Sequence, residues 1–224
     1  MPAAEGPSFW ETEEAVERFA ARDPDVRLLA LLDAQDDPPG FRVLDLGCAA
    51  GRNAVVLAER GFDLQALDAS SAMVKRTRER LAPILGRENA ESRVRVGRME
   101  RLADFPDASF DLVVALGVLH QAKSGEQWKR AVSEVARLLV RGGRLLYAGW
   151  SPLSRPEGVP LEAVPGEPGM YVGFHTGRHY LVGARDLDRE LAGAGFTPEV
   201  PTEEVRVERE NGERVTVNGL YRSG

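Results

Sequence analysis

The stretch VLDLGCAAGRN, residues 43–53, decides the fold, because an apolar strand here runs into a turn of small residues and a helix follows. Small residues let a backbone approach a ligand closely, and the first turn of a helix offers unpaired N–H groups. The next apolar strand ends just before Asp68, 17 residues after Gly51. A carboxylate at that position can accept hydrogen bonds from both hydroxyls of a ribose. The pattern predicts a site for a ligand that carries a nucleoside.

Outward from this turn, strands and helices alternate. We expect strands at residues 41–46, 62–67, 93–96, 110–115 and 144–150, and helices at 53–60, 70–81, 127–140 and 184–194. Gly142-Gly143 is expected to end the third of these helices. Asn211-Gly212, between strands expected at 200–210 and 213–221, is a strong hairpin signal. The alternation predicts an α/β fold with a mostly parallel sheet and a C-terminal antiparallel hairpin.

Two segments flank or interrupt this pattern. Residues 1–40 are expected to form an N-terminal helical segment, in which Phe9–Leu32 makes one or two helices and Pro24 starts the second after Asp23 as its cap. The main domain is expected at residues 41–224. Within it, residues 151–177 lack periodicity and contain many Pro and Gly residues, which is typical of a functional or a disordered loop.

The composition of the chain argues against several classes of binding partner. The formal net charge of −6 and the pI of about 5.3 disfavour nucleic acid, because an acidic chain repels phosphate. Cys48 is the one cysteine, which excludes an internal disulfide and fits a reducing, cytoplasmic location. The N-terminal residues do not resemble a signal peptide, and no apolar stretch is long enough to span a bilayer. We therefore expect no membrane partner.

The residues of the turn discriminate between two classes of cofactor. A dinucleotide site needs the pattern G-x-G-x-x-G, but Ala49 stands at its second glycine and no glycine follows Gly51 at the third. Asp45 would also repel a pyrophosphate and would favour an ammonium or sulfonium group. An alternative stays open, in which Gly47 and Gly51 serve only a tight turn and Asp68 is only a helix cap.

The order and spacing of several motifs resemble the class I S-adenosylmethionine-dependent methyltransferases, over about residues 41–150. Besides the turn, these are RME at 98–100, FPDASFDLV at 105–113, VLH at 118–120 and EVARLLVRGG at 134–143. The resemblance implies a Rossmann-like, seven-stranded sheet with helices on both faces, and S-adenosylmethionine as the cofactor.

The resemblance also implies site residues. Asp45 would orient the methionine ammonium, Asp68 would hold the ribose, and Leu116 would offer its carbonyl to the ammonium. Arg98 departs from the family, which usually has an aspartate there, and an arginine cannot accept a hydrogen bond from the adenine amino group. The expected cofactor-binding residues are Asp45, Gly47, Cys48, Ala49, Gly51, Asp68, Ala69, Arg98, Met99 and Leu116.

The acceptor side is less defined, because methyl transfer needs alignment and exclusion of water more than one fixed catalytic group. His120, at the end of the fourth strand, is a candidate base or acceptor-orienting group, and a structural histidine is the alternative. Residues 151–181 are expected to form a lid over the substrate, although their aromatic side chains could instead pack for stability. Two histidines are too few for a metal site, so none is expected. The candidate substrate residues are Trp10, Tyr171, His175, His179 and Tyr180.

The motifs therefore predict methyl transfer from S-adenosylmethionine to a small-molecule acceptor. The segment after the fourth strand, LGVLH at 116–120, lacks the Pro-Pro-aromatic motif of enzymes that methylate base amino groups. Three alternatives remain: a non-catalytic S-adenosylmethionine binder, a protein or RNA methyltransferase, and a nicotinamide oxidoreductase. The sequence leaves the acceptor and the oligomeric state open.

Overall fold

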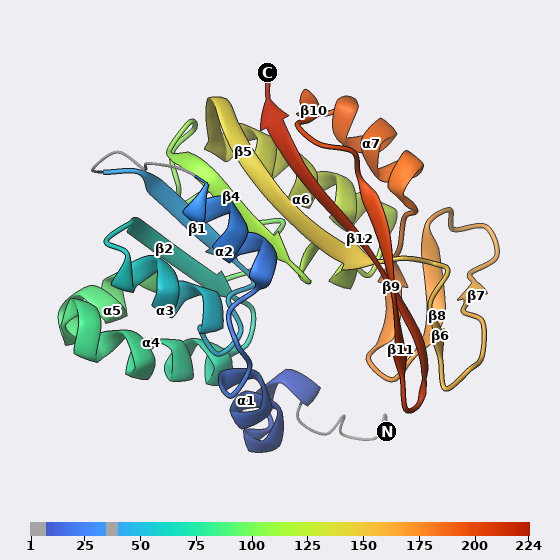
Figure 1. The fold of residues 1–224 in the computed structure, drawn as a ribbon, viewed down its shortest axis with the longest axis horizontal. Helices are drawn as coiled ribbons and strands as arrows, with labels where there is room; N and C mark the ends of the chain where they lie inside the picture. The colour runs from blue at the N-terminus through green and yellow to red at the C-terminus, as the bar shows by residue number, and fades with distance from the viewer. Residues whose placement is uncertain (1–7, 35–39) are drawn as a thin grey trace, which may run out of the picture. The chain divides into compact units, whose positions relative to one another are not determined.

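A computed structural model describes residues 8–34 and 40–224 of the chain (Figure 1). The chain folds as two units, residues 1–98 and residues 99–224. The stretch DDPPG at residues 36–40, whose Pro and Gly residues predict a linker, lies outside the described residues except for Gly40.

The first unit contains the decisive turn. Its strands β1 (Arg42–Leu46), β2 (Asp63–Asp68) and β3 (Val94–Val96) pair in parallel in this order. The connecting helices are α3 (Arg52–Glu59), α4 (Ser71–Leu85) and α5 (Arg87–Arg93), the last of which was not predicted. Successive side chains of a strand point to opposite faces, and Val43 and Leu44 are both 0% exposed. Both faces of β1 are therefore covered, as parallel sheets require.

The N-terminal segment is helical, as predicted, but divides differently. It contains a 3-10 turn, η1 (Phe9–Glu11), and two helices, α1 (Glu13–Ala20) and α2 (Val26–Asp33). The prediction that Asp23 caps α2 and Pro24 begins it was wrong. Asp25 is the N-cap, because its carboxylate accepts the backbone N–H of Arg27.

The second unit is a mixed sheet. Strands β4 (Phe110–Leu116) and β5 (Leu139–Trp150) are parallel, and β12 (Gly212–Ser223) pairs antiparallel with β5. The hairpin around Asn211-Gly212 is confirmed, since β11 (Glu203–Arg209) pairs with β12. Strands β10 (Phe196–Pro198) and β6 (Arg155–Pro156) also pair with β12. The seven predicted strands are thus all present, and β6 and β10 are additional strands paired with β12.

Helix α6 (Gly125–Leu138) packs on β5 through an edge-to-face contact of Trp128 with Tyr147, whose ring centroids are 6.3 Å apart. The expected helix end at Gly142-Gly143 was wrong, because α6 ends at Leu138 and β5 runs through both glycines. A register shift opposite Phe110 and the left-handed φ of +78° at Gly142 accommodate this early start of the strand. The 3-10 turn η2 (Leu119–Gln121) follows β4, and α7 (Ala184–Ala192) precedes β10.

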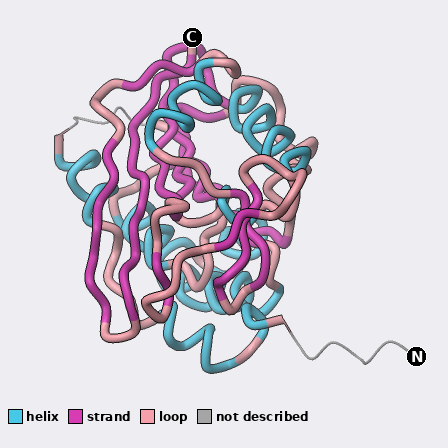
Figure 2. Tube along the Cα trace, turned by 90° about the vertical axis from the view of Figure 1, so that its right-hand side faces the viewer, coloured by secondary structure: helices cyan, strands magenta, loops and turns pink. Residues whose placement is uncertain are grey.

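The segment at residues 151–181, expected to lack regular structure, contains a small antiparallel sheet. Its strands are β7 (Glu162–Ala163), β8 (Met170–Phe174) and β9 (Gly177–Tyr180), drawn in magenta in Figure 2. The backbone N–H of Tyr180 donates to the carbonyl of Ala122 at 3.1 Å, which attaches β9 to the end of η2. The sheet therefore lies beside the segment that follows β4.

Within residues 8–34 and 40–224, no helix has both the length and the apolar character needed to cross a bilayer.

Candidate functional site

The turn between β1 and α3 is held open by left-handed backbone. Gly47, Ala49 and Gly51 have φ values of +74°, +47° and +82°. The N–H groups of Gly47 and Cys48 both donate to the carbonyl of Leu67, at 2.7 and 3.0 Å, which fastens the turn to the end of β2. Glycine adopts such φ values at no steric cost, but Ala49 does not.

Asp68 connects this turn to helix α4. Its Oδ2 accepts the N–H of Ala49 and its Oδ1 accepts the N–H of Ser70, each at 2.9 Å. Burial raises the pKa of Asp68 above its ordinary value, while the hydrogen bonds from Ser70 and Ala49 oppose that rise. The cap of α4 is Ser70 itself, whose hydroxyl accepts the N–H of Met73 at 3.2 Å. Asp68 therefore has a structural role beside α4 and also faces the turn.

Asp45 is a buried carboxylate with unused hydrogen-bonding capacity. It is 2% exposed, and its Oδ2 has no hydrogen-bond partner among the described residues. Burial raises the pKa of Asp45 to about 7; the charge of Arg52 lowers it, and the charge of Asp68 raises it further. A buried carboxylate without a partner is costly, so the site fits a ligand with a cationic hydrogen-bond donor. S-adenosylmethionine, with its ammonium and ribose, fits the pair of Asp45 and Asp68.

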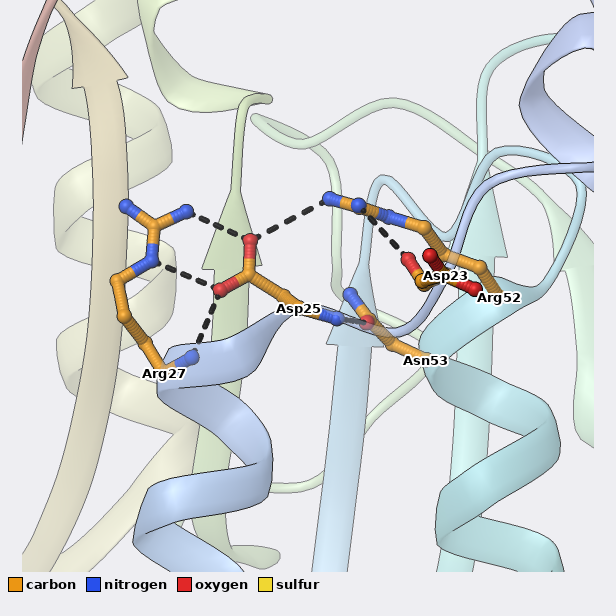
Figure 3. A network of polar contacts seen from close by, with 5 residues as sticks. All are labelled: Asp23, Asp25, Arg27, Arg52 and Asn53. Carbon is orange, nitrogen blue, oxygen red and sulfur yellow. Dashed lines mark hydrogen bonds and ion pairs between the residues drawn. The ribbon is translucent and has the colours of Figure 1, made fainter.

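A polar network fixes the start of α3 (Figure 3). Arg52 donates to the carbonyl of Asp23 at 3.1 Å and to the carboxylate of Asp25 at 3.4 Å. Asn53 accepts the N–H of Asp25 at 2.9 Å, and Arg27 binds both carboxylate oxygens of Asp25. Arg52 therefore acts on two carboxylates. It forms an ion pair with Asp25, which is 7% exposed, and its charge lowers the pKa of Asp45.

The N-terminal segment is attached near the same turn. The hydroxyl of Ser70 donates to the carbonyl of Trp10 at 2.8 Å, and Glu11 accepts the N–H groups of Ser71 and Ala72 at 2.9 and 3.2 Å. Phe9, Trp10 and Phe19 pack on an apolar cluster that adjoins Ala49 and contains the following residues: Ala15, Val16, Ala50 and Met73. The candidate substrate residue Trp10 thus packs on the cluster that contains Ala50 of the turn.

The remaining predicted cofactor residues have these positions. Ala69 is exposed and follows Asp68, and Cys48 is buried beneath the turn beside Thr77. Arg98 is exposed in the loop after β3. In the second unit, Met99 is buried and Leu116 is the last residue of β4.

An aromatic cluster lies at the carboxyl ends of β4 and β5 in the second unit. The ring of Trp150, which ends β5, lies 4.5 Å from that of His120 and 4.0 Å from that of Phe174 in β8. His179 in β9 lies 5.9 Å from His120. Phe174 and His179, both in the segment at residues 151–181, therefore lie beside Trp150 and His120 at the ends of these two strands. Sequence reasoning missed Trp150 and Phe174, although Trp150 is the last residue of the predicted fifth strand.

His120 is a buried hydrogen-bond donor. Its Nε2 lies 3.0 Å from the amide nitrogen of Gln121; with this amide group as the donor, Nε2 accepts and the ring proton is on Nδ1. Nδ1 is buried and has no partner in the described part of the chain. Burial, with smaller contributions from His179 and Lys123, lowers the pKa of His120 well below its usual value. The ring is neutral at pH 7 and presents an N–H rather than a lone pair at Nδ1.

The other candidate substrate residues differ in their surroundings. Tyr180 is 6% exposed, stacks on Trp128 with centroids 4.9 Å apart, and donates to Glu190 at 3.0 Å. These contacts match the packing role that was the alternative. His175 is exposed in the turn between β8 and β9, and half-buried Tyr171 lies opposite His179 in the β8–β9 pairing. Among residues 8–34 and 40–224, no group of three His, Cys, Asp or Glu residues could hold a metal ion.

Comparison with known proteins finds a family that matches part of this chain. Residues 44–147 match the methyltransferase domain family. The chain is 28% identical over 117 residues to a probable tRNA methyltransferase 9B of Mus musculus, covering 52% of this chain and 23% of that protein. It is 35% identical over 141 residues to a demethylmenaquinone methyltransferase of Beutenbergia cavernae, covering 61% of this chain and 51% of that protein. The chain thus spans about a quarter and about half of these two relatives.

A solved structure shows the same fold. It is the 1,6-didemethyltoxoflavin-N1-methyltransferase of Burkholderia thailandensis, with 1,6-didemethyltoxoflavin and S-adenosylhomocysteine bound. Its TM-score with this chain is 0.59 at 23% identity, over 95% of this chain and 80% of that one. The expected Rossmann-like fold is confirmed. Residues 44–147 of this chain therefore resemble a methyltransferase domain, and the chain shares its fold with a solved methyltransferase that binds S-adenosylhomocysteine.

Proposed function

We propose that this protein transfers a methyl group from S-adenosylmethionine to a small-molecule acceptor. The observation that carries the proposal is a pair of carboxylates, buried Asp45 and half-buried Asp68, on either side of the turn that follows β1. Asp45 offers an unpaired oxygen to an ammonium, and Asp68 offers a carboxylate to the two ribose hydroxyls. The match of residues 44–147 to the methyltransferase domain family supports this pairing.

In this proposal the protein binds the cofactor and aligns it with the acceptor. When bound, S-adenosylmethionine supplies a methyl group already activated by the positive sulfur, so the protein need not activate the donor. The carboxylates fix the orientation of the cofactor, and the left-handed turn keeps side chains away from it. Orientation of donor and acceptor then provides much of the rate enhancement.

We assign the acceptor to the aromatic cluster of the second unit. Trp150 and Phe174 are half-buried, so their rings remain partly available to a flat apolar ligand, and Nδ1–H of His120 can donate to an acceptor oxygen or nitrogen. In this assignment His120 orients the acceptor rather than removing its proton. Two of the similar proteins are named for small acceptors, demethylmenaquinone and 1,6-didemethyltoxoflavin.

A second candidate function is methylation of tRNA, which the similarity to the mouse protein favours. The net charge of −6 opposes it, since binding to a phosphate backbone depends on basic residues. The two candidates differ in acceptor class and can be separated directly.

The test is transfer of a labelled methyl group. Purified protein is incubated with methyl-tritiated S-adenosylmethionine and, separately, with a panel of hydroxylated aromatic and N-heterocyclic compounds or with total tRNA. We expect label in at least one small compound and none in tRNA, with Asp68→Ala as the inactive control. Label in tRNA alone would replace the small-molecule assignment. Cofactor binding without transfer to either would instead indicate a non-catalytic binder.

A further inference from the structure

Ala49 is a strained residue in the middle of the cofactor turn. Its φ of +47° lies in the left-handed region, which disfavours every residue with a Cβ except in special settings. Neighbouring Gly47 and Gly51 adopt left-handed φ values without this penalty. Some contact must therefore hold Ala49 in this conformation.

The peptide groups on both sides of Ala49 are held by side chains. Its N–H donates to Asp68 at 2.9 Å, and its carbonyl accepts the hydroxyl of Thr77 at 2.7 Å. Thr77 lies on α4, is 0% exposed, and is 28 residues away in sequence. Arg80, one turn further along α4, donates to the carbonyl of Ala50 at 2.8 Å. Helix α4 thus binds two successive carbonyls of the turn.

Thr77 also lies tight against the end of the turn. A Cβ added to Gly51 would lie 2.9 Å from Cγ2 of Thr77 and 3.3 Å from its Cα. Thr77 therefore contacts the turn through its methyl group and binds it through its hydroxyl. Valine has the same shape as threonine and lacks only the hydroxyl, so the two contacts can be separated by mutation.

We propose that Thr77 is a positioning residue of the cofactor site: its hydroxyl holds Ala49 in the left-handed conformation that directs the Ala49 N–H to Asp68. This rests on the proposed function, because the turn and Asp68 are assigned there to the cofactor. Thr77 acts through Ala49 and Asp68. Without the hydroxyl, the strained residue relaxes, and the Asp68 carboxylate loses the N–H that orients it.

The proposal makes a prediction about two residues together. If the hydroxyl of Thr77 matters because Ala49 is strained, a glycine at position 49 removes the need for it. A hydroxyl that served only general packing of α4 would matter equally with either residue at position 49. The effect of Thr77→Val should therefore depend on whether position 49 is alanine or glycine.

The test is calorimetric titration of S-adenosylhomocysteine into the wild type, Thr77→Val, Thr77→Ser, Ala49→Gly and the double variant Ala49→Gly/Thr77→Val. We expect Thr77→Val to weaken binding about fivefold to tenfold, as loss of a buried hydrogen bond predicts. Thr77→Ser should restore most of the affinity. In the Ala49→Gly background, Thr77→Val should cost less than twofold. Thr197→Val, on an exposed residue of β10, is the matched control.

An equal loss from Thr77→Val in both backgrounds, or no loss in either, would overturn the proposal. If the single Thr77→Val variant does not fold, the same coupling is measured from urea unfolding of Thr77→Ser and Thr77→Val in the Ala49→Gly background. There the proposal predicts equal stability and equal affinity. Failure of the wild type to bind S-adenosylhomocysteine would instead refute the proposed function, while the stability coupling between positions 49 and 77 would still test the role of Thr77.

Discussion

The carboxylate of Asp68 accepts the backbone N–H of Ala49 at 2.9 Å, which ties the end of β2 to the turn after β1. Its second oxygen accepts the N–H of Ser70 at the start of α4. Two backbone donors of the chain thus orient one carboxylate. Such preorganisation lowers the cost of ordering side chains when a ligand binds.

Replacing Asp68 with alanine should weaken binding of S-adenosylhomocysteine by about 1.5–3 kcal/mol, because charge-assisted hydrogen bonds to the ribose are lost. Isothermal titration calorimetry measures this directly. Asp104→Ala, which changes an exposed aspartate of the second unit, is the matched control and should bind normally. Normal affinity in a folded Asp68→Ala variant would leave Asp68 with a structural role only.

Affinity for S-adenosylhomocysteine should depend on pH through Asp45. The pKa of this buried carboxyl is about 7, and an ammonium binds to its ionised form. Affinity should therefore rise with pH between 5.5 and 8, by about tenfold or more, and then level off. Asp45→Asn should bind weakly with a flat profile. A flat profile in the wild type would show that Asp45 does not bind the ammonium.

The carboxylate of Asp45 should also lower the free energy of unfolding at high pH. A carboxyl whose folded-state pKa is raised stabilises the fold fully below its unfolded pKa near 3.8, and this stability is lost as the pH rises through about 7. The asparagine of Asp45→Asn is neutral at every pH. At pH 8 the free energy of unfolding of this variant, measured with urea, should therefore exceed that of the wild type by about 1–2 kcal/mol. The difference should shrink at pH 5. Equal stability of the two proteins at pH 8 would mean that Arg52 compensates the charge.

Glu11 should attach the N-terminal segment to α4. Burial would raise its pKa, but hydrogen bonds with Ser70, Ser71 and Ala72 hold the pKa of Glu11 below its usual value. A depressed pKa gives stability that is present above the unfolded value and is lost as the pH falls through the folded value.

Glu11→Gln should therefore destabilise the protein at pH 7 by about 0.5–1 kcal/mol, as expected for a partly exposed carboxylate at a helix N-terminus. It should also speed proteolytic cleavage within residues 9–20. Glu91→Gln, on an exposed residue of α5, is the control. Unchanged cleavage would show that the apolar contacts of Phe9, Trp10 and Phe19 are sufficient.

His120 should act as a donor through Nδ1. The amide of asparagine superimposes approximately on the Nδ1 side of a histidine, whereas that of glutamine reaches the Nε2 side. His120→Asn should therefore keep more methyl-transfer activity than His120→Gln, by about twofold to tenfold. Cofactor binding should be unchanged in both. A rate that falls with decreasing pH and loses this dependence in both variants would instead identify His120 as a base.

The local pattern was sufficient to locate the turn after β1 and the C-terminal hairpin. Asp45 and Asp68 lie within the last two residues of β1 and β2, and Gly212, with φ of +116°, follows from the Asn-Gly hairpin signal. Contacts between residues that are distant in the sequence could not be predicted from it. Thr77 bears no motif that links it to Ala49, and the density of aromatic residues at 170–180 does not reveal that Tyr180 packs on Trp128 while Phe174 faces Trp150. The strands of the small sheet are two to five residues long, too short for periodicity to predict.

The choice of cofactor is tested most directly by calorimetric titration of the wild-type protein with S-adenosylhomocysteine and with NAD⁺ under the same conditions at pH 8. The account predicts saturable binding of S-adenosylhomocysteine and no comparable heat with NAD⁺. Tight binding of NAD⁺ without a signal for S-adenosylhomocysteine would contradict it.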